Sequence, residues 1–169
     1  MDDLLELPDD GCRYELFAGS LLVGPVLTPI HQATVFALQR TLHAAKPADL
    51  TVLSAVGVRA SESDLYIPDL VVVPKAAARS AEPMVRPEDV LLAVEVAGPG
   101  TAAVDRHLKS AAYAEAGVPA YWRLESALHV YRIDGDLYGE PAVFRAGAQA
   151  RLSEPFAVSF DPGELSEFP

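Results

Sequence analysis

Residues 90–97, VLLAVEVA, decide the fold. They are apolar on both alternating faces except for one carboxylate, Glu95. Strands covered on both sides read as near-continuous apolar runs, so this stretch predicts a central strand of a sheet. A buried carboxylate without compensation costs at least several kcal/mol. Glu95 therefore belongs to a structural ion pair, reaches solvent at the strand end, or ligates a metal ion.

A second acid lies in residues 66–73, YIPDLVVV, where Asp69 follows Pro68. Alternation places Asp69 on the same face as Val71, although a Pro-Asp pair also commonly begins a strand or turn. If Asp69 and Glu95 converge from neighbouring strands, their repulsion raises a pKa or recruits a divalent cation. Hard oxygen ligands suit magnesium or manganese.

The segments before this pair predict a hairpin, a helix and two strands. Two short apolar runs around Gly19 indicate a hairpin over residues 14–23. Thr28 offers an N-cap and Pro29 a first helical position for a helix of about 16 residues that ends before Pro47. β-Branched and aromatic residues predict strands over 50–58 and 66–73, with a connecting loop over 74–89.

The segments after Glu95 predict a second helix and more strands. A helix capped by Thr101 runs to Ala116 and stops at Gly117. Strands follow over 121–124, 128–133 and from 137 onward, with a further edge over 155–160. The expected fold class is α/β (α+β): a mixed β-sheet flanked by helices, with an N-terminal β-hairpin and additional C-terminal strands.

The second helix and the N-terminal part add candidate site residues. Asp105, Lys109 and Tyr113 recur every four residues, so they share one helix face, although a plain salt bridge also explains such spacing. Lys109 lies near enough in sequence to approach Glu95 if the helix packs back on its strand. His31 is expected to be solvated or hydrogen-bonded at a helix start, and Glu15 to lie on the surface; both remain accessory candidates.

Composition limits the class of protein. The chain has 169 residues and a net charge of −11, which argues against bulk attraction of phosphates. Nine of its acids lie near the two ends, within 1–12 and after 153, so the body of the chain is nearly neutral. One domain is expected over 1–169, with acidic ends at 1–12 and 161–169. No stretch is apolar enough to span a bilayer and no signal peptide begins the chain, so a cytoplasmic protein without a membrane partner is expected.

Several catalytic patterns are missing from the sequence. Cys12 is the sole cysteine, which excludes an intramolecular disulfide and a cysteine-based zinc site. Neither a His-Glu-x-x-His zinc motif nor a phosphate-binding glycine loop nor a Gly-x-Ser-x-Gly nucleophile elbow occurs.

The ordered set Pro68-Asp69, Glu95-Val96, Lys109, Tyr113 and Tyr121-Trp122 resembles the Uma-two family of endonucleases. That family lies within the restriction endonuclease-like PD-(D/E)XK superfamily. The resemblance covers most of the chain and implies a mixed sheet flanked by helices. It also implies Asp69 and Glu95 as ligands of Mg²⁺ (or Mn²⁺), with phosphodiester hydrolysis in nucleic acid, DNA foremost, as the activity.

One position departs from the superfamily pattern. The pattern places lysine two residues after the second acid, where this chain has Ala97, so Lys109 would act from the following helix. Glu15 or Asp105 would complete the metal's shell. Two alternatives remain: a catalytically silent nuclease-fold protein that binds or scaffolds, and a metal-dependent hydrolase of a small phosphorylated substrate. A homodimer is expected if both strands of a duplex are cut.

Overall fold

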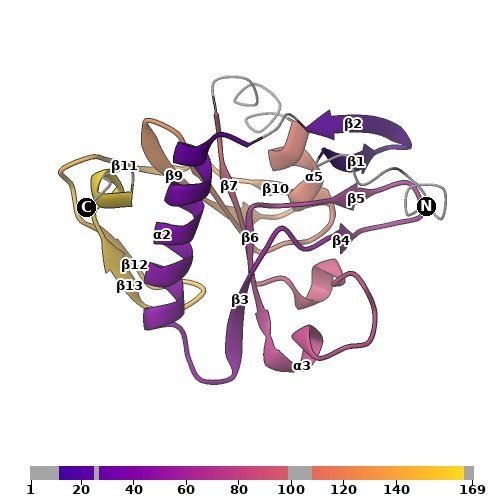
Figure 1. Cartoon of the computed structure of the whole chain (residues 1–169), viewed down its shortest axis with the longest axis horizontal. Helices are drawn as coiled ribbons and strands as arrows, with labels where there is room; N and C mark the ends of the chain where they lie inside the picture. Colours follow the sequence, from indigo (N-terminus) through magenta and orange to yellow (C-terminus); the bar gives the residue numbers. More distant parts are fainter. Residues whose placement is uncertain (1–11, 25–26, 99–107, 166–169) are drawn as a thin grey trace.

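The computed structural model of the chain describes residues 12–24, 27–98 and 108–165. Its centre is a sheet with strand order β10-β9-β8-β7-β6-β3, and β11 pairs with β9 (Figure 1). β7 and β8 are parallel, whereas β3, β6 and β9 join their neighbours antiparallel. The expected mixed sheet is therefore confirmed. Its strands are β3 (Leu50–Ser54), β6 (Leu70–Pro74), β7 (Leu92–Val96), β8 (Ala120–Leu124), β9 (Ala127–Asp134), β10 (Leu137–Tyr138) and β11 (Ala142–Arg145).

The central strands are covered on both faces, as their apolar runs predict. In β6, Leu70 and Val72 belong to one apolar cluster, whereas Val71 and Val73 belong to another on the opposite face. All four side chains are fully buried. Because successive side chains of a strand point to opposite faces, a sheet of this kind needs packing layers on both sides.

Helix α2 (Pro29–Ala45) covers the first face. Thr28 caps it, since the Thr28 hydroxyl accepts from the backbone N–H of His31 at 3.3 Å, and Pro29 begins it as expected. Leu38 and Leu42 are fully buried in the cluster beneath it. A two-stranded sheet of β12 (Ala150–Leu152) and β13 (Val158–Phe160) lies beside α2 (Figure 1). The edge expected over 155–160 is thus shorter and pairs with β12 rather than with the central sheet.

A second sheet, in the order β2-β1-β5-β4, lies on the other face. Its strands are β1 (Arg13–Phe17), β2 (Ser20–Gly24), β4 (Val58–Arg59) and β5 (Leu65–Tyr66). The β1–β2 pair confirms the expected hairpin, with Gly19 at a φ of +78° in its turn.

Both strands expected before Glu95 are interrupted. The stretch expected over 50–58 divides into β3 and β4, and the one expected over 66–73 divides between β5 and β6. The chain turns at Ala55, which has a φ of +51° and donates its N–H to the Asp69 carbonyl at 3.1 Å. Pro68 has no N–H for a ladder bond. At each break the chain passes between the two sheets: from the central sheet to the second one after β3, and back to the central sheet before β6.

Helix α5 (Ser110–Glu115) packs on the same face as the second sheet. Ala112 and Tyr113 are buried in its apolar cluster, and Gly117 ends the helix region with a φ of +79°. The first part of the helix expected over 101–116 lies outside the described residues. The connection 74–89, expected as a loop, holds two short helices, α3 (Lys75–Ala78) and η1 (Pro87–Asp89), the second begun by a proline at its first position. None of the described helices has the length and apolar character needed to cross a membrane.

Candidate active site

Asp69 directly precedes β6, and Glu95 lies in β7, the strand beside it. In the antiparallel β6–β7 pair, Leu70 faces Val94. Continuing that register by one residue places Asp69 beside Glu95, with both side chains on one face of the sheet. Asp69 is 3% exposed and Glu95 is 2% exposed. Like charges directly opposite each other destabilise a sheet, so each carboxylate needs its own compensation.

Asp69 is held by three donors. Its Oδ1 accepts from Arg13 Nη1 at 2.7 Å, and its Oδ2 lies 3.0 Å from His31 Nε2 and accepts from the Val96 N–H at 2.8 Å. Burial works to raise the pKa of Asp69, but the His31 hydrogen bond and the Arg13 charge outweigh it and hold the pKa below its ordinary value. The expectation that the paired acids raise a pKa therefore does not hold at Asp69, whose pKa is lowered.

Glu95 is held by donors from α5 and its N-cap. Its Oε1 accepts from Lys109 Nζ at 2.8 Å and from the Tyr113 hydroxyl at 2.7 Å. Burial and the Glu95 charge together raise the pKa of Tyr113 well above its ordinary value, which keeps this phenol a donor. The structure therefore brings Lys109 and Tyr113, four residues apart, to the same carboxylate oxygen.

Glu15 joins the same cluster. It is 2% exposed, so the expectation of a surface carboxylate is wrong. Glu15 Oε2 lies 3.2 Å from Lys109 Nζ, and Oε1 accepts from the backbone N–H of Ile67 at 2.7 Å. These two partners make its burial tolerable. The ammonium of Lys109 consequently bridges Glu15 and Glu95 within the interior.

His31 and Asp105 have different outcomes. His31 is hydrogen-bonded at the start of α2 but only 9% exposed, so it is buried rather than solvated. Its Nδ1 is buried and has no hydrogen-bond partner among the described residues. Asp105 lies outside the described residues, so its expected place beside Lys109 stays a prediction.

Sequence reasoning missed Arg13. This residue begins β1 and points to the same side as Glu15, two positions later. Its Nη1 also donates to the Ile67 carbonyl at 3.3 Å, while its Nε is buried without a partner. Desolvation opposes the charged form, but Asp69, Glu95 and Glu15 together raise the pKa of Arg13. The sequence held one indication of this role: Arg13 and Glu15, a base and an acid two positions apart, lie on the same face of a strand.

A cavity of about 300 Å³ opens beside the Asp69 end of the cluster. Arg13, His31 and Asp69 form part of its wall, and the rest comes from α2 and from the turn at Ser54 and Ala55. The cluster is buried, but Asp69 and Arg13 are thus reached through this cavity. A ligand that enters this cavity meets a cation and a carboxylate side by side.

The donor chemistry of the site fits a hard divalent cation. Magnesium is usually bound by one or two carboxylates, with waters and substrate phosphates as further ligands. Asp69 and Glu95 supply two carboxylates at opposed positions, with hydrogen bonds that orient each of them. Within the described ranges no group of three or more His, Cys, Asp or Glu side chains is arranged to hold a metal ion. In this structure Arg13 and Lys109 neutralise the two carboxylates.

Comparisons with known proteins agree on fold and family. The computed structure is similar to a crystal structure of a "putative nuclease belonging to DUF820" from Anabaena variabilis, with a TM-score of 0.77 and 17% sequence identity over 98% of this chain and 96% of that one. No curated protein matches the sequence. The model of the Uma2 family, described as "Putative restriction endonuclease", matches residues 1–164. Since that match spans nearly the whole chain, the protein belongs to the Uma2 family of restriction endonuclease-like proteins.

Proposed function

We propose that this protein is a divalent-metal-dependent nuclease that hydrolyses phosphodiester bonds in nucleic acid, with DNA as the favoured polymer. The opposed pair of buried carboxylates, Asp69 and Glu95, with the Lys109 ammonium 2.8 Å from Glu95, carries the proposal. Two carboxylates and an amine in one cluster are the groups that metal-assisted phosphoryl chemistry needs. Membership of the Uma2 family supports the same activity.

Asp69 and Glu95 would hold Mg²⁺ or Mn²⁺ in this proposal. The bound ion would lower the pKa of a coordinated water and offset charge on the scissile phosphate. His31 and the Val96 N–H fix the orientation of Asp69, while Tyr113 fixes that of Glu95. These residues position the carboxylates rather than touch the substrate.

Lys109 and Arg13 would act on the phosphate and the attacking water. The Lys109 ammonium can orient the water oxygen that forms the new bond to phosphorus, and its positive charge stabilises the negative charge that develops there. The attacking water releases a proton to solvent as its oxygen bonds to phosphorus, the bond from phosphorus to the leaving oxygen breaks, and the leaving oxygen takes up a proton from solvent. Arg13, at the cavity wall, would donate to a non-bridging oxygen of the phosphate.

Lys109 can supply the amine that the superfamily pattern places two residues after the second acid, where this chain has Ala97. A lysine on β7 at that position would share a strand with Glu95, whereas Lys109 comes from the N-cap of α5. Its Nζ nevertheless lies within hydrogen-bond distance of both Glu95 and Glu15. We infer that Lys109 takes the role of the superfamily's strand lysine.

Metal-dependent cleavage tests the proposal. Purified protein is incubated with labelled single-stranded and duplex DNA and RNA, with Mn²⁺, with Mg²⁺ or with chelator. Glu95→Gln is expected to abolish cleavage. The matched control is Glu88→Gln, which changes an exposed carboxylate whose arginine partner is 3.7 Å away. Equal cleavage by wild type and Glu95→Gln would overturn the assignment, as would the absence of cleavage with every substrate and metal.

A second candidate is a nuclease-fold protein that binds nucleic acid without cleaving it. The ion pair of Asp69 with Arg13 favours it, because a guanidinium already neutralises the first carboxylate. The net charge of −11 also favours this candidate over an enzyme that binds duplex DNA through many contacts with backbone phosphates. Binding that survives chelation, with no cleavage under any metal, would select this candidate.

A further inference from the structure

The exposed side of α2 carries an unusual set of side chains for a solvent face. Gln32, Phe36, Arg40 and His43 are all exposed and recur at helical spacing. Phe36 is 61% exposed, and the Arg40 guanidinium lies 5.9 Å from the centroid of its ring. An amide, an aromatic ring, a guanidinium and an imidazole therefore follow one another along the helix that also holds His31 against Asp69.

Two cavities meet at Phe36. The cavity of about 300 Å³ beside Asp69 reaches Phe36 past three polar side chains, those of Gln32, Gln39 and Ser54. A larger groove of about 680 Å³ begins on the same ring and continues along α2. Because Phe36 and Gln39 line both, the two cavities adjoin.

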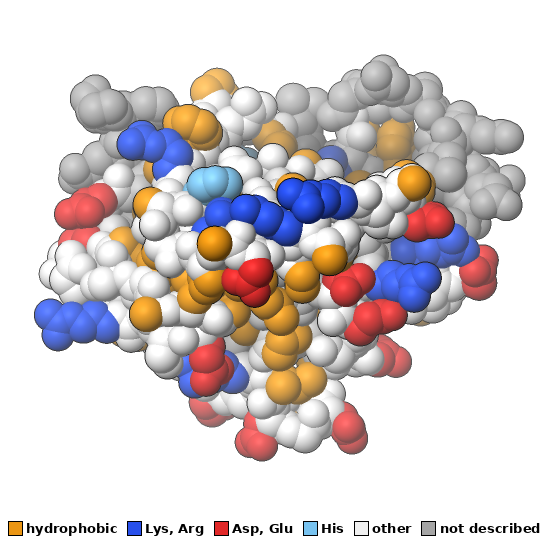
Figure 2. All heavy atoms as spheres, turned by 90° about the horizontal axis from the view of Figure 1, so that it is seen from below, with side chains coloured by type: hydrophobic (Ala, Val, Ile, Leu, Met, Phe, Trp, Pro, Cys, Tyr) orange, Lys and Arg blue, Asp and Glu red, His pale blue; other side chains and the backbone are white. Residues whose placement is uncertain are grey.

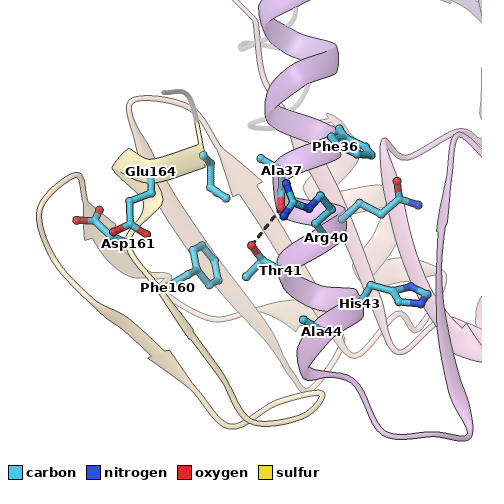
Figure 3. Close-up of a pocket in the computed structure, with 11 residues that line it drawn as sticks. Phe36, Ala37, Arg40, Thr41, His43, Ala44, Phe160, Asp161 and Glu164 are labelled. Carbon is cyan, nitrogen blue, oxygen red and sulfur yellow. Dashed lines mark hydrogen bonds between the residues drawn. The ribbon is translucent and has the colours of Figure 1, made fainter. Parts of the chain in front are cut away.

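The larger groove lies between α2 and the C-terminal segment. Figure 3 shows Phe160, Asp161 and Glu164 on one side of α2, and the side chains of Phe36 and His43 on its other side. All of these residues line the groove, together with Arg40. At a rise of about 1.5 Å per residue, the stripe from Gln32 to His43 is about 16 Å long. Cavity and groove together form a path that starts at Asp69 and runs beside α2.

We propose that this path binds single-stranded nucleic acid, with one unpaired base stacked on Phe36 in the smaller cavity. The proposal rests on the proposed function, because it places that nucleotide next to the scissile phosphate. Arg13 is at the phosphate end of the cavity, Gln32 and Gln39 face the base edges with amide donors and acceptors, and the strand continues past Arg40.

The size of the smaller cavity favours an unpaired nucleotide over a duplex. A cavity of about 300 Å³ is at the lower end of the range for small-molecule sites, which is about 300–1,000 Å³. It therefore accepts a group of nucleotide size but not the width of a double helix. A base in a duplex would have to leave its stack to enter it.

The chemistry of the path also favours a single strand. Proteins that bind single strands combine basic side chains along the backbone with aromatic side chains on which successive bases stack. Here Phe36 is the aromatic platform, and Arg40 beside its ring and Arg13 in the smaller cavity are the basic side chains. Duplex binding instead depends on many phosphate contacts, whereas this chain has a net charge of −11. Figure 2 shows acidic and basic side chains interspersed over one face of the molecule, around apolar atoms, rather than a continuous basic groove there.

Binding without metal separates this inference from catalysis. Fluorescence anisotropy in chelator measures the affinity of the full chain for a labelled oligothymidylate and for a hairpin duplex. The oligothymidylate is expected to bind at least about 10-fold more tightly, and Phe36→Ala to weaken that binding about 10-fold. Phe36→Trp should retain it. Val143→Ala, at an exposed apolar residue of β11, is the matched control and should leave it unchanged.

Each outcome decides the inference. Equal affinity for hairpin and single strand, or an unchanged affinity in Phe36→Ala, would overturn it. The absence of binding to either oligonucleotide would overturn it too. The proposed function is judged separately, since it fails only if Mn²⁺-dependent cleavage is absent or survives Glu95→Gln.

Discussion

Arg13 and Asp69 are 56 residues apart in the sequence, and their Nη1 and Oδ1 atoms are 2.7 Å apart in the structure. The Arg13 guanidinium is thus bound to the carboxylate that would ligate a metal ion in the proposed function. The site without metal is thus stabilised by the chain's own cations. A divalent ion and Arg13 compete for the same oxygen, and this competition is open to measurement.

Arg13→Gln should make the metal-free protein less stable. Removal of one partner leaves the Asp69 charge buried without its main cation, so the free energy of unfolding in urea is expected to fall by about 3 kcal/mol. Saturating Mn²⁺ should then stabilise the variant more than it stabilises the wild type. The control is Arg59→Gln, whose partner Glu62 is exposed and whose loss should cost less than about 1 kcal/mol. Equal stabilisation of variant and wild type by Mn²⁺ would contradict the competition.

Lys109→Met should impair both folding and cleavage. The substitution leaves Glu15 and Glu95 buried without the ammonium between them, which is expected to lower the free energy of unfolding by about 3 to 5 kcal/mol. Adding Glu15→Gln to this variant should recover part of that loss, because one buried charge disappears. Recovered stability with cleavage still absent would separate the two roles of Lys109. A double variant that cleaves normally would refute the catalytic one.

Acid should destabilise the protein partly through Asp69. The pKa of this carboxyl is lower in the folded protein than its ordinary value of 3.8, so the unfolded chain takes up the proton first as the pH falls. The stability that ionised Asp69 contributes is therefore complete above about pH 4 and is lost below it. Unfolding measured from about pH 5 to about pH 3 should give a steeper decline in wild type than in Asp69→Asn. Parallel declines would assign the acid sensitivity to other groups.

Tyr113→Phe should be milder than Lys109→Met. It removes one hydrogen bond to the Glu95 carboxylate but leaves the Lys109 ion pair, so a loss of about 1.5 to 3 kcal/mol in unfolding free energy is expected. The raised pKa of Tyr113 also means that wild-type stability declines above about pH 10, where the unfolded chain releases the phenol proton. The variant should decline less steeply in that range. A cleavage rate in Tyr113→Phe as low as in Lys109→Met would mean that the phenol does more than orient Glu95.

Part of this arrangement follows from local sequence patterns. Two apolar runs predict that Asp69 and Glu95 are carboxylates within neighbouring strands, and capping residues predict where α2 begins. Both signals are local, since each depends on residues a few positions apart. The spacing of Lys109 and Tyr113 likewise predicts a shared helix face, and the structure puts both on Glu95 Oε1.

The remaining contacts depend on tertiary packing. Nothing near Glu15 in the sequence indicates that Lys109 and the Ile67 N–H will surround it. The same holds for Arg13, whose partner lies on a different sheet. The break between β3 and β4 depends on the left-handed backbone of Ala55, a conformation that alanine rarely adopts and that no residue pattern announces.

The amine of this site is carried by a helix instead of the strand that carries Glu95. Its position is consequently set by how α5, six residues long, seats Ala112 against the aromatic rings beneath it. Ala112 is 8% exposed in this cluster, so a larger side chain there should displace α5 and the ammonium at its N-cap. The proposed cleavage should therefore depend on the volume of this interior alanine as well as on the charged groups themselves.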